Sequence, residues 1–399
     1  MEAIEEFSNH RILLDLSLEL QLLLELVHVD IDIDYLNKFK DKNINWGKFL
    51  QLAKHHRLIP ILYYNISRNN LLWLPEKVKG SLFEKYNQNV FSMLHLTSEM
   101  NEIGQLFNKN NIQALFLKGP IIGEELYGDI SLRTSKDLDI LISKKDLKQT
   151  KELLIKFGYI EKPESPSILN EDKLRTHHSV FYKPNSPFTF EIHWRLNDLP
   201  DKEPGFKDLW NRRRVSNFSG ESIYFLSEED LFLYLVSHGA RHGWFRLRWL
   251  VDIDRLLHSN TRWNKDKRVI KQYSNEVLIG QAIILVSKLL RRPFKEEYDH
   301  LINRQVIILS EIAITIIREI EYDQPFPEKL YPLYRSYNWK LQKNIVQKFK
   351  VVTIKAYPSF IDYQVLKLPK IFHFLYFPLR PFFIIGRRLG ILRVEIKER

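Results

Sequence analysis

Two aspartates separated by a single residue, Asp137 and Asp139, open the apolar stretch 137–142, whose composition predicts a buried strand. Side chains two apart on a strand project to the same face, so this spacing brings the two carboxylates together. Two close carboxylates resist ionisation in a dry site unless a cation balances them. Mg²⁺ suits this donor set, because it binds one or two carboxylates together with substrate phosphates. The alternative is a solvated strand edge on which Asp137 acts as a cap or turn residue.

A glycine turn precedes this strand along the chain, within Leu117-Lys118-Gly119-Pro120. The pattern predicts a strand that ends in a turn and leads into a helix. Gly119 would let the backbone approach a phosphate near the N-terminus of that helix. Lys118 adds a cation that could contact the same phosphate. We therefore expect Lys118 and Gly119 to contact a phosphate group.

These motifs, in this order, resemble the DNA polymerase β-like nucleotidyltransferase superfamily. The resemblance rests on the Leu117-Lys118-Gly119 turn, the Tyr127-Gly128-Asp129 step and the Arg133-to-Ile142 segment that holds both aspartates. More narrowly, the chain is similar to a poorly characterised bacterial nucleotidyltransferase family, and more loosely to AbiEii-type toxins. The resemblance covers roughly residues 45 to 260.

In such enzymes the Asp-x-Asp pair and a third acid on a later strand hold two metals. The resemblance therefore implies Mg²⁺ or Mn²⁺ as cofactor and a nucleoside triphosphate as substrate. The third acid is expected to be Glu191, within the alternating stretch Phe188–Trp194. A His-Trp pair follows that acid in the family, as His193-Trp194 does here, and the segment 238–252 also resembles a family helix. Asp137, Asp139 and Glu191 are thus the expected metal ligands and catalytic residues.

Two positions depart from the superfamily pattern. Pro120 stands where a serine usually contacts the terminal phosphates, and Glu191 stands where aspartate is more common. The first change puts the grip on the nucleotide in doubt, and the second moves the ligand oxygens outward by one methylene.

Arg133 and Ser135 lie between the glycine turn and the metal strand. Arg133 could clamp a phosphate with its fork of donors, or form a structural ion pair with Asp129 or Asp137. Ser135 could contact the nucleotide, but a local hydrogen bond in the turn before the strand is the favoured role.

Three histidines are candidates for an acceptor pocket. His193 shares a strand face with Glu191, and His238 and His242 are four residues apart on an expected helix. Each could instead be a satisfied structural histidine. His177 and His178 carry a weaker signal. Neither a His-Glu-x-x-His motif nor any cysteine is present, so a zinc site of those types is excluded.

Composition sets wider limits. The 399 residues lack cysteine, which excludes disulfides, and the acidic N-terminus has no signal-peptide pattern, so we expect a cytoplasmic protein. The net charge of +11 would attract phosphates in nucleotides, RNA or anionic lipid, but solvated lysine-rich faces are the favoured explanation, because no arginine-rich run or RNA-binding signature is present.

The periodicity predicts an α+β fold: a small mixed β-sheet core with helices on one side, flanked by helical regions. The expected parts are an N-terminal helical region (1–110), the catalytic core (111–226), a C-terminal helical domain (227–345) and a basic aromatic tail (346–399). The expected strands are 113–117, 138–142, 159–161, 178–182 and 188–194. The expected helices are 8–30, 46–56, 59–67, 75–108, 120–127, 145–157, 228–239, 245–258, 274–290 and 298–320.

The tail combines aromatic residues with Lys and Arg. Pro378 and Pro381 interrupt its apolar run, so we expect no transmembrane span. A peripheral contact with a membrane is one alternative, and a C-terminal helix packed on the helical domain is the other.

The resemblance implies an enzyme that moves a nucleoside monophosphate from ATP or another triphosphate to a hydroxyl acceptor, with release of pyrophosphate. The acceptor stays open among a small molecule, a peptide or protein side chain, and RNA, the last as in an AbiEii-like toxin. The further alternatives are a non-catalytic nucleotide-binding module and a membrane-surface or RNA-binding scaffold, the last motivated by the tail.

Overall fold

The computed structural model describes residues 16–163, 168–170, 176–184, 186–197, 203–258, 269, 276–293, 296–320, 326–342 and 345–392. The chain divides into two compact units. Unit 1 comprises residues 1–143 and 202–341, and unit 2 comprises residues 144–201 and 342–399.

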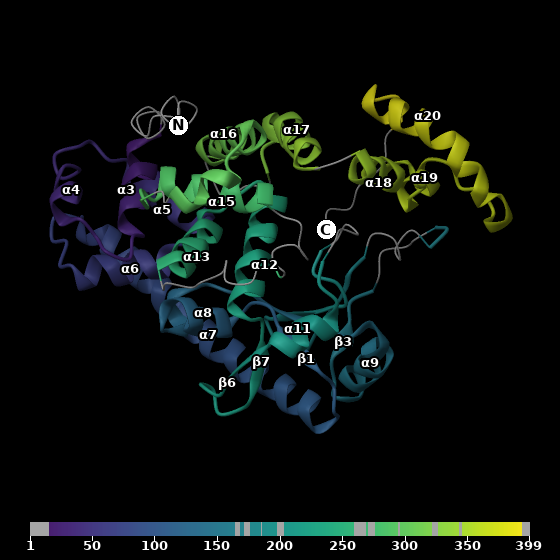
Figure 1. The fold of residues 1–399 in the computed structure, drawn as a ribbon, viewed down its shortest axis with the longest axis horizontal. Helices are drawn as coiled ribbons and strands as arrows, with labels where there is room; N and C mark the ends of the chain where they lie inside the picture. The colour runs from purple at the N-terminus through teal and green to yellow at the C-terminus, as the bar shows by residue number, and fades with distance from the viewer. Residues whose placement is uncertain are drawn as a thin grey trace. The chain divides into compact units, whose positions relative to one another are not determined.

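Unit 1 begins with helices and ends with helices, and its strands lie between them in the sequence (Figure 1). The first helices are α3 (Leu18–Leu26), α4 (Ile33–Asn37), α5 (Trp46–His55), α6 (Ile59–Arg68) and α7 (Glu76–Lys109). The strands are β1 (Ala114–Phe116), β2 (Asp137–Ile142), β6 (Arg214–Ser216) and β7 (Ile223–Phe225). Between and after the strands lie α8 (Pro120–Tyr127), η1 (Ile130–Leu132), α11 (Phe206–Arg212), α12 (Glu228–Arg241), α13 (Leu247–His258), α15 (Glu276–Leu289), η3 (Glu296–Leu301), α16 (Arg304–Glu319), η4 (Glu328–Leu330) and α17 (Tyr331–Leu341).

The strands of unit 1 pair in the order β2-β1-β7-β6. Phe116 of β1 lies opposite Ile140 of antiparallel β2 and opposite Phe225 of parallel β7. The predicted α+β class with a mixed sheet is confirmed. In β2, only Asp137 at the start of the strand is half-buried, and the other five residues are buried. The strand that bears the aspartates is therefore an interior element.

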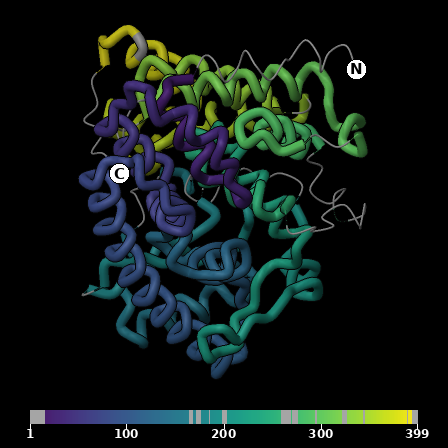
Figure 2. The backbone as a smooth tube through the Cα atoms, turned by 90° about the vertical axis from the view of Figure 1, so that its left-hand side faces the viewer, coloured from purple at the N-terminus to yellow at the C-terminus, as the bar shows by residue number. Residues whose placement is uncertain are grey.

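Helix α7 supports the loop that leads into β2. Proline 75 precedes the helix, as the sequence predicted, and α7 then runs without interruption to Lys109 (Figure 2). From this helix Asn89 donates a 2.7 Å hydrogen bond to the carbonyl oxygen of Ser131, and Tyr86 Oη lies 3.1 Å from Ser131 Oγ. A polar residue at position 89 of the buried helix face thus fixes the loop between α8 and β2.

Unit 2 contains three antiparallel strands in the order β3-β4-β5 and the helices of the tail. Its elements are η2 (Lys144–Asp146), α9 (Leu147–Lys156), β3 (Ile160–Glu161), β4 (His178–Tyr182), β5 (Thr189–His193), α18 (Ile345–Ala356), α19 (Phe360–Val365), η5 (Lys370–Leu375) and α20 (Tyr376–Arg388). His178 lies opposite His193, and Val180 lies opposite Glu191. The predicted pairing of 178–182 with 188–194 is confirmed.

Two predicted helices were too long. The helix expected over 8–30 spans Leu18–Leu26, because Ser17 caps its first turn by accepting from the Leu20 amide, and residues 8–15 lie outside the described part. The helix expected over 298–320 is divided at Asn303, whose side chain accepts from the Val306 amide and starts α16.

Candidate active site

The two aspartates of β2 differ in exposure. Asp139 is only 3% exposed, whereas Asp137 is half-buried. The Leu117 amide donates a 2.8 Å hydrogen bond to the Asp139 carbonyl oxygen, which extends the pairing of β1 and β2 to the start of the glycine turn. The turn that holds Lys118 and Gly119 is therefore fixed beside β2.

Lys118 forms an ion pair with the buried aspartate. Its Nζ lies 3.3 Å from Asp139 Oδ2, and the two side chains are 14% and 4% exposed. The same ammonium group lies 5.6 Å from the centre of the Tyr234 ring on α12. Burial raises the pKa of Tyr234 to about 12. The positive charge of Lys118 lowers this pKa and the negative charge of Asp139 raises it, each by less than burial does. Tyr234 therefore remains protonated at neutral pH, and Lys118 neutralises the carboxylate.

Gly119 is required by its backbone conformation and by its surroundings. Its φ angle is +98°, a region that residues with a Cβ atom rarely adopt. A Cβ atom at this position would also lie 2.8 Å from Leu138 Cδ2. Pro120 occupies the first turn of α8, where its missing N–H removes one donor from the helix N-terminus.

Arg133 forms a buried fork with Asp252 of α13. Its Nε lies 3.1 Å from Asp252 Oδ1, and its Nη2 lies 3.0 Å from Oδ2. Tyr127 donates to the same carboxylate at 2.8 Å, and burial raises the pKa of Tyr127 well above its ordinary value. The partners expected from the sequence were Asp129 and Asp137. Asp129 instead caps η1 by accepting from the Ser131 amide at 2.7 Å.

The loop before β2 is fixed by local and distant contacts. Ser135 Oγ lies 3.3 Å from the Asp137 carbonyl oxygen, which agrees with the local role favoured from the sequence. Arg248 of α13 donates to the Thr134 carbonyl oxygen. Burial lowers the pKa of Arg248 to about 9, and the nearby Arg133 acts in the same direction. The guanidinium of Arg248 is thus positioned by the loop backbone.

His238 lies in the last turn of α12 and His242 caps the C-terminus of that helix, with their ring centres 4.7 Å apart. Both rings contact Trp249: His242 stacks on it at 5.2 Å, and His238 meets its edge at 5.3 Å. Burial lowers the pKa of His238 well below its ordinary value, and the positive charge of Lys118 adds to the effect. His238 is therefore neutral in the folded protein, and the role of both histidines in an acceptor pocket stays a prediction.

In unit 2, Glu191 lies among imidazole rings. Its Oε2 lies 3.3 Å from His193 Nε2 and 3.8 Å from His178 Nε2. His177, His178 and His193 each offer a ring nitrogen, and these nitrogens lie within 4.8 Å of one another. Imidazole nitrogens suit transition metals, whereas the carboxylate of Glu191 also suits Mg²⁺ or Mn²⁺. His177 and His178, which carried little signal in the sequence, thus belong to the surroundings of Glu191.

The expected metal ligands are distributed over both units. Asp137 and Asp139 belong to unit 1, and Glu191 belongs to unit 2. Their joint action on one metal pair stays a prediction.

Sequence reasoning missed Asp252 and Tyr234. Both are buried polar residues on helices that are otherwise rich in buried apolar residues. An acid at such a position needs a buried cationic partner, so the stretch Leu250-Val251-Asp252-Ile253 carried a usable signal for Asp252. The identity of the partner, Arg133, could not be read from the spacing.

The sequence matches a family described as uncharacterised nucleotidyltransferase over residues 42–291, which is more than half of the chain. A comparison with curated proteins finds no match. Among solved structures, the chain is similar to an antigenic nucleotidyltransferase-like protein from Paracoccidioides brasiliensis, with 17% sequence identity and a TM-score of 0.32. That alignment covers 51% of this chain and 96% of the other.

Proposed function

Because the chain belongs to the uncharacterised nucleotidyltransferase family, we propose that it moves a nucleoside monophosphate from ATP or another triphosphate to a hydroxyl acceptor. The acceptor oxygen attacks the α-phosphorus in line. The bond from the α-phosphorus to the bridging oxygen of the β-phosphate breaks, and pyrophosphate leaves. The hydroxyl proton passes to a carboxylate, for which Glu191 is the candidate.

The observation that carries this proposal is the buried pair of Lys118 and Asp139, whose charged atoms lie 3.3 Å apart. A carboxylate as buried as Asp139 requires a balancing positive charge. The position therefore suits a cation, and the oxygen donors of Asp137, Asp139 and Glu191 suit Mg²⁺ or Mn²⁺. The metals, when bound, would neutralise triphosphate charge and lower the pKa of the acceptor hydroxyl.

Lys118, Gly119 and Arg133 form the proposed triphosphate side of the site. If Asp139 held a metal, the Lys118 ammonium would be available to phosphate oxygens, and the Gly119 backbone would give them close access. Among the described residues, no hydrogen-bond acceptor serves the buried Nη1 of Arg133. An unsatisfied buried donor costs about 1–3 kcal/mol, so a phosphate oxygen is a fitting partner for it. Ser135 retains its local bond and orders the loop.

His193, His238 and His242 form the proposed acceptor side. A neutral imidazole both donates and accepts hydrogen bonds, which suits recognition of a hydroxyl group. A small molecule, a protein side chain and RNA are all acceptors of this chemistry.

The test is transfer of label from each α-labelled triphosphate with Mg²⁺ to cell lysate separated into small molecules, protein and RNA. The wild type is compared with Asp139→Asn and with Asp41→Asn, a control at an exposed acid of unit 1. We expect label in one fraction for the wild type and for Asp41→Asn, and none for Asp139→Asn. The labelled fraction names the acceptor class. Equal transfer by Asp139→Asn in a folded sample would contradict the metal assignment.

A second candidate function follows from Pro120, which offers neither the hydroxyl nor the amide donor of a serine at this turn. A non-catalytic module would keep the nucleotide site and lose turnover. It predicts binding of a triphosphate with Mg²⁺, lost in Asp139→Asn, without label transfer to any fraction.

A further inference from the structure

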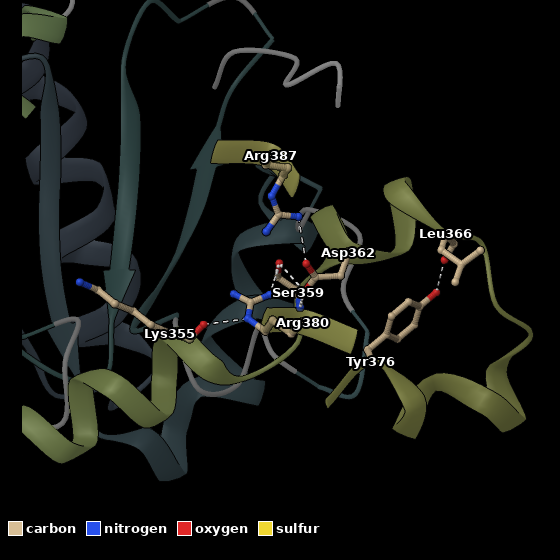
Figure 3. A network of polar contacts seen from close by, with 7 residues as sticks. All are labelled: Lys355, Ser359, Asp362, Leu366, Tyr376, Arg380 and Arg387. Atoms are coloured by element: carbon tan, nitrogen blue, oxygen red, sulfur yellow. Dashed lines mark hydrogen bonds and ion pairs between the residues drawn. The ribbon is translucent and has the colours of Figure 1, made fainter. Parts of the chain in front are cut away.

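Helix α20 presents apolar side chains to solvent, whereas its Arg380 is buried and its Arg387 is only 23% exposed. Arg380 and Arg387 both donate to the carboxylate of Asp362 on α19 (Figure 3). Phe382 and Ile385 are 69% and 54% exposed. Helices at a water-facing surface normally point their charged groups outward and bury their apolar residues. The arrangement in α20 therefore fits contact with a second apolar phase.

A polar network holds the tail helices in this arrangement. Asp362 is completely buried, and besides the two arginines it accepts from the Ser359 amide at 2.8 Å. Arg380 Nε also donates to the Lys355 carbonyl oxygen at 2.7 Å, which joins α18 to α20 (Figure 3). Because these donors and acceptors are satisfied inside the tail, its exposed apolar residues stand on an ordered scaffold.

The neighbouring elements α18 and η5 also expose apolar side chains. Neither α18 nor η5 contains a buried residue. Their apolar side chains are strongly exposed: Phe349 by 70%, Ile371 by 76% and Phe374 by 58%. We define the apolar tail surface as Phe349, Ile371, Phe374, Phe382, Ile385 and Leu389. Helix α20 packs against both η5 and α18, and exposed apolar side chains on neighbouring packed elements are typical of an interaction site.

The charges around this surface have one sign. Between residues 345 and 392 the chain has five lysines and three arginines but a single acid, Asp362. That acid is buried on its two arginines, so the surface of this segment offers cations and no carboxylate. Aromatic side chains combined with basic residues are typical of segments that lie in the interface of an anionic membrane.

We propose that the apolar tail surface docks on an anionic phospholipid membrane, with Phe382 and Ile385 inserted below the headgroups and lysines of the tail at phosphate level. Within the described residues, no helix combines the length and apolar character that crossing a bilayer requires. Helix α20 has 13 residues and is about 20 Å long, less than the roughly 30 Å of a hydrocarbon core. The contact is therefore parallel to the membrane plane.

The test is co-sedimentation of the full chain with phosphatidylcholine vesicles, with and without phosphatidylserine. We expect binding only to the anionic vesicles, weakened by salt. The double variant Phe382→Ser with Ile385→Ser should lower the partition coefficient at least about tenfold, since two apolar anchors are lost. Phe91→Ser with Leu94→Ser is the matched control: the same spacing on α7 of unit 1 and similar exposures of 73% and 54%. This control should bind like the wild type.

Hydrogen exchange locates the contact. Anionic vesicles should increase the protection of amides in residues 371–391 of the wild type, and thermal unfolding should confirm that both double variants are folded. Asp139→Asn should bind vesicles as the wild type does. The membrane proposal can therefore hold even if the protein transfers no nucleotide. Absence of binding to anionic vesicles, or equal binding by the Phe382/Ile385 variant, would overturn the proposal. The proposal would also be overturned if the Phe382/Ile385 variant changed only RNA retention or the oligomeric state and left vesicle binding unchanged.

Discussion

The ammonium of Lys118 and the carboxylate of Asp139 form a buried ion pair, with 3.3 Å between Nζ and Oδ2. The lysine comes from the turn after β1, and the aspartate is the third residue of β2, next to the residues that pair with β1. The protein thus places a positive charge at the position where the proposed function requires a metal. We therefore expect the stability of the protein to depend on a cation beside Asp139.

Removal of the Lys118 charge should reveal that dependence. Lys118→Met removes the ammonium that lies 3.3 Å from the buried Asp139 carboxylate, so unfolding by urea in EDTA should show a loss of about 3–5 kcal/mol. Mg²⁺ should restore more stability to this variant than it adds to the wild type, because no ammonium competes for the carboxylate. Lys148→Met, which removes the 89%-exposed lysine of a surface pair, should change stability by less than about 1 kcal/mol. A Lys118→Met protein as stable as the wild type in EDTA would argue against the buried pair.

The Arg133–Asp252 fork should be essential for folding stability. Arg133→Lys keeps the charge but cannot form both hydrogen bonds, and Asp252→Asn leaves a buried guanidinium without its counter-ion. We expect losses of about 3–5 kcal/mol for Asp252→Asn and a smaller loss for Arg133→Lys, measured from urea unfolding. The control is Arg318→Ala, from an ion pair that is 38% and 37% exposed. If Arg133→Lys and Asp252→Asn changed the free energy of unfolding as little as Arg318→Ala does, the Arg133–Asp252 fork would contribute little to stability.

Local structure in this chain follows rules that act over a few residues. The sequence predicted α8 at Pro120–Tyr127 with its true bounds, because a glycine turn, a first-turn proline and a following glycine define both ends. It also predicted the start of α12, where Ser227 accepts from the Asp230 amide at 3.1 Å. The mixed sheet followed from alternating apolar segments of the right length.

The contacts that define the site were less accessible from the sequence. Arg133 and Asp252 are 119 positions apart, and nothing in their spacing selects this partner over nearer acids. The orientation of α20 was equally hidden, because its pattern of apolar and basic residues does not say which face is buried. Such choices are made by packing between distant segments, which a single sequence does not encode in any local pattern.

Gly119→Ala should destabilise the protein through both backbone strain and a side-chain clash. The alanine would have to adopt a φ angle near +98°, and its Cβ atom would lie 2.8 Å from Leu138 Cδ2. We expect a loss of about 1–3 kcal/mol in the free energy of unfolding, and weaker binding of triphosphate. Gly80→Ala in α7 is the control, since a Cβ atom there meets nothing within 4 Å. This substitution should raise the free energy of unfolding by about 0.5–1 kcal/mol. A gain in stability for both variants would remove the conformational argument for Gly119.

Acid should destabilise the protein through its buried histidines. Burial lowers the pKa of His238 well below 6.5, whereas the unfolded chain protonates near 6.5. Below that pH the unfolded state binds more protons, so the free energy of unfolding falls by up to about 1.4 kcal/mol per pH unit for each such histidine. His56 is buried with the same direction of shift. Urea unfolding between about pH 7.5 and about pH 5.5 should show a shallower loss in His238→Gln, and an unchanged loss in His300→Gln at an exposed site.

Glu191 should depend on His193 for its position. The two side chains are 3.3 Å apart, and His193 is buried while Glu191 is partly exposed, so the imidazole limits where the carboxylate can point. If Glu191 serves the metals, His193→Ala should lower the affinity for Mn²⁺ and the rate of label transfer about 10–100-fold, without loss of the fold. His193→Gln keeps a side-chain donor and should recover part of that loss, whereas His95→Ala at an exposed site of α7 should behave as the wild type. Titration of Mn²⁺ by paramagnetic resonance measures the affinity without reference to turnover. An unchanged Mn²⁺ affinity in His193→Ala, with Glu191→Gln strongly impaired, would show that Glu191 is held by other groups.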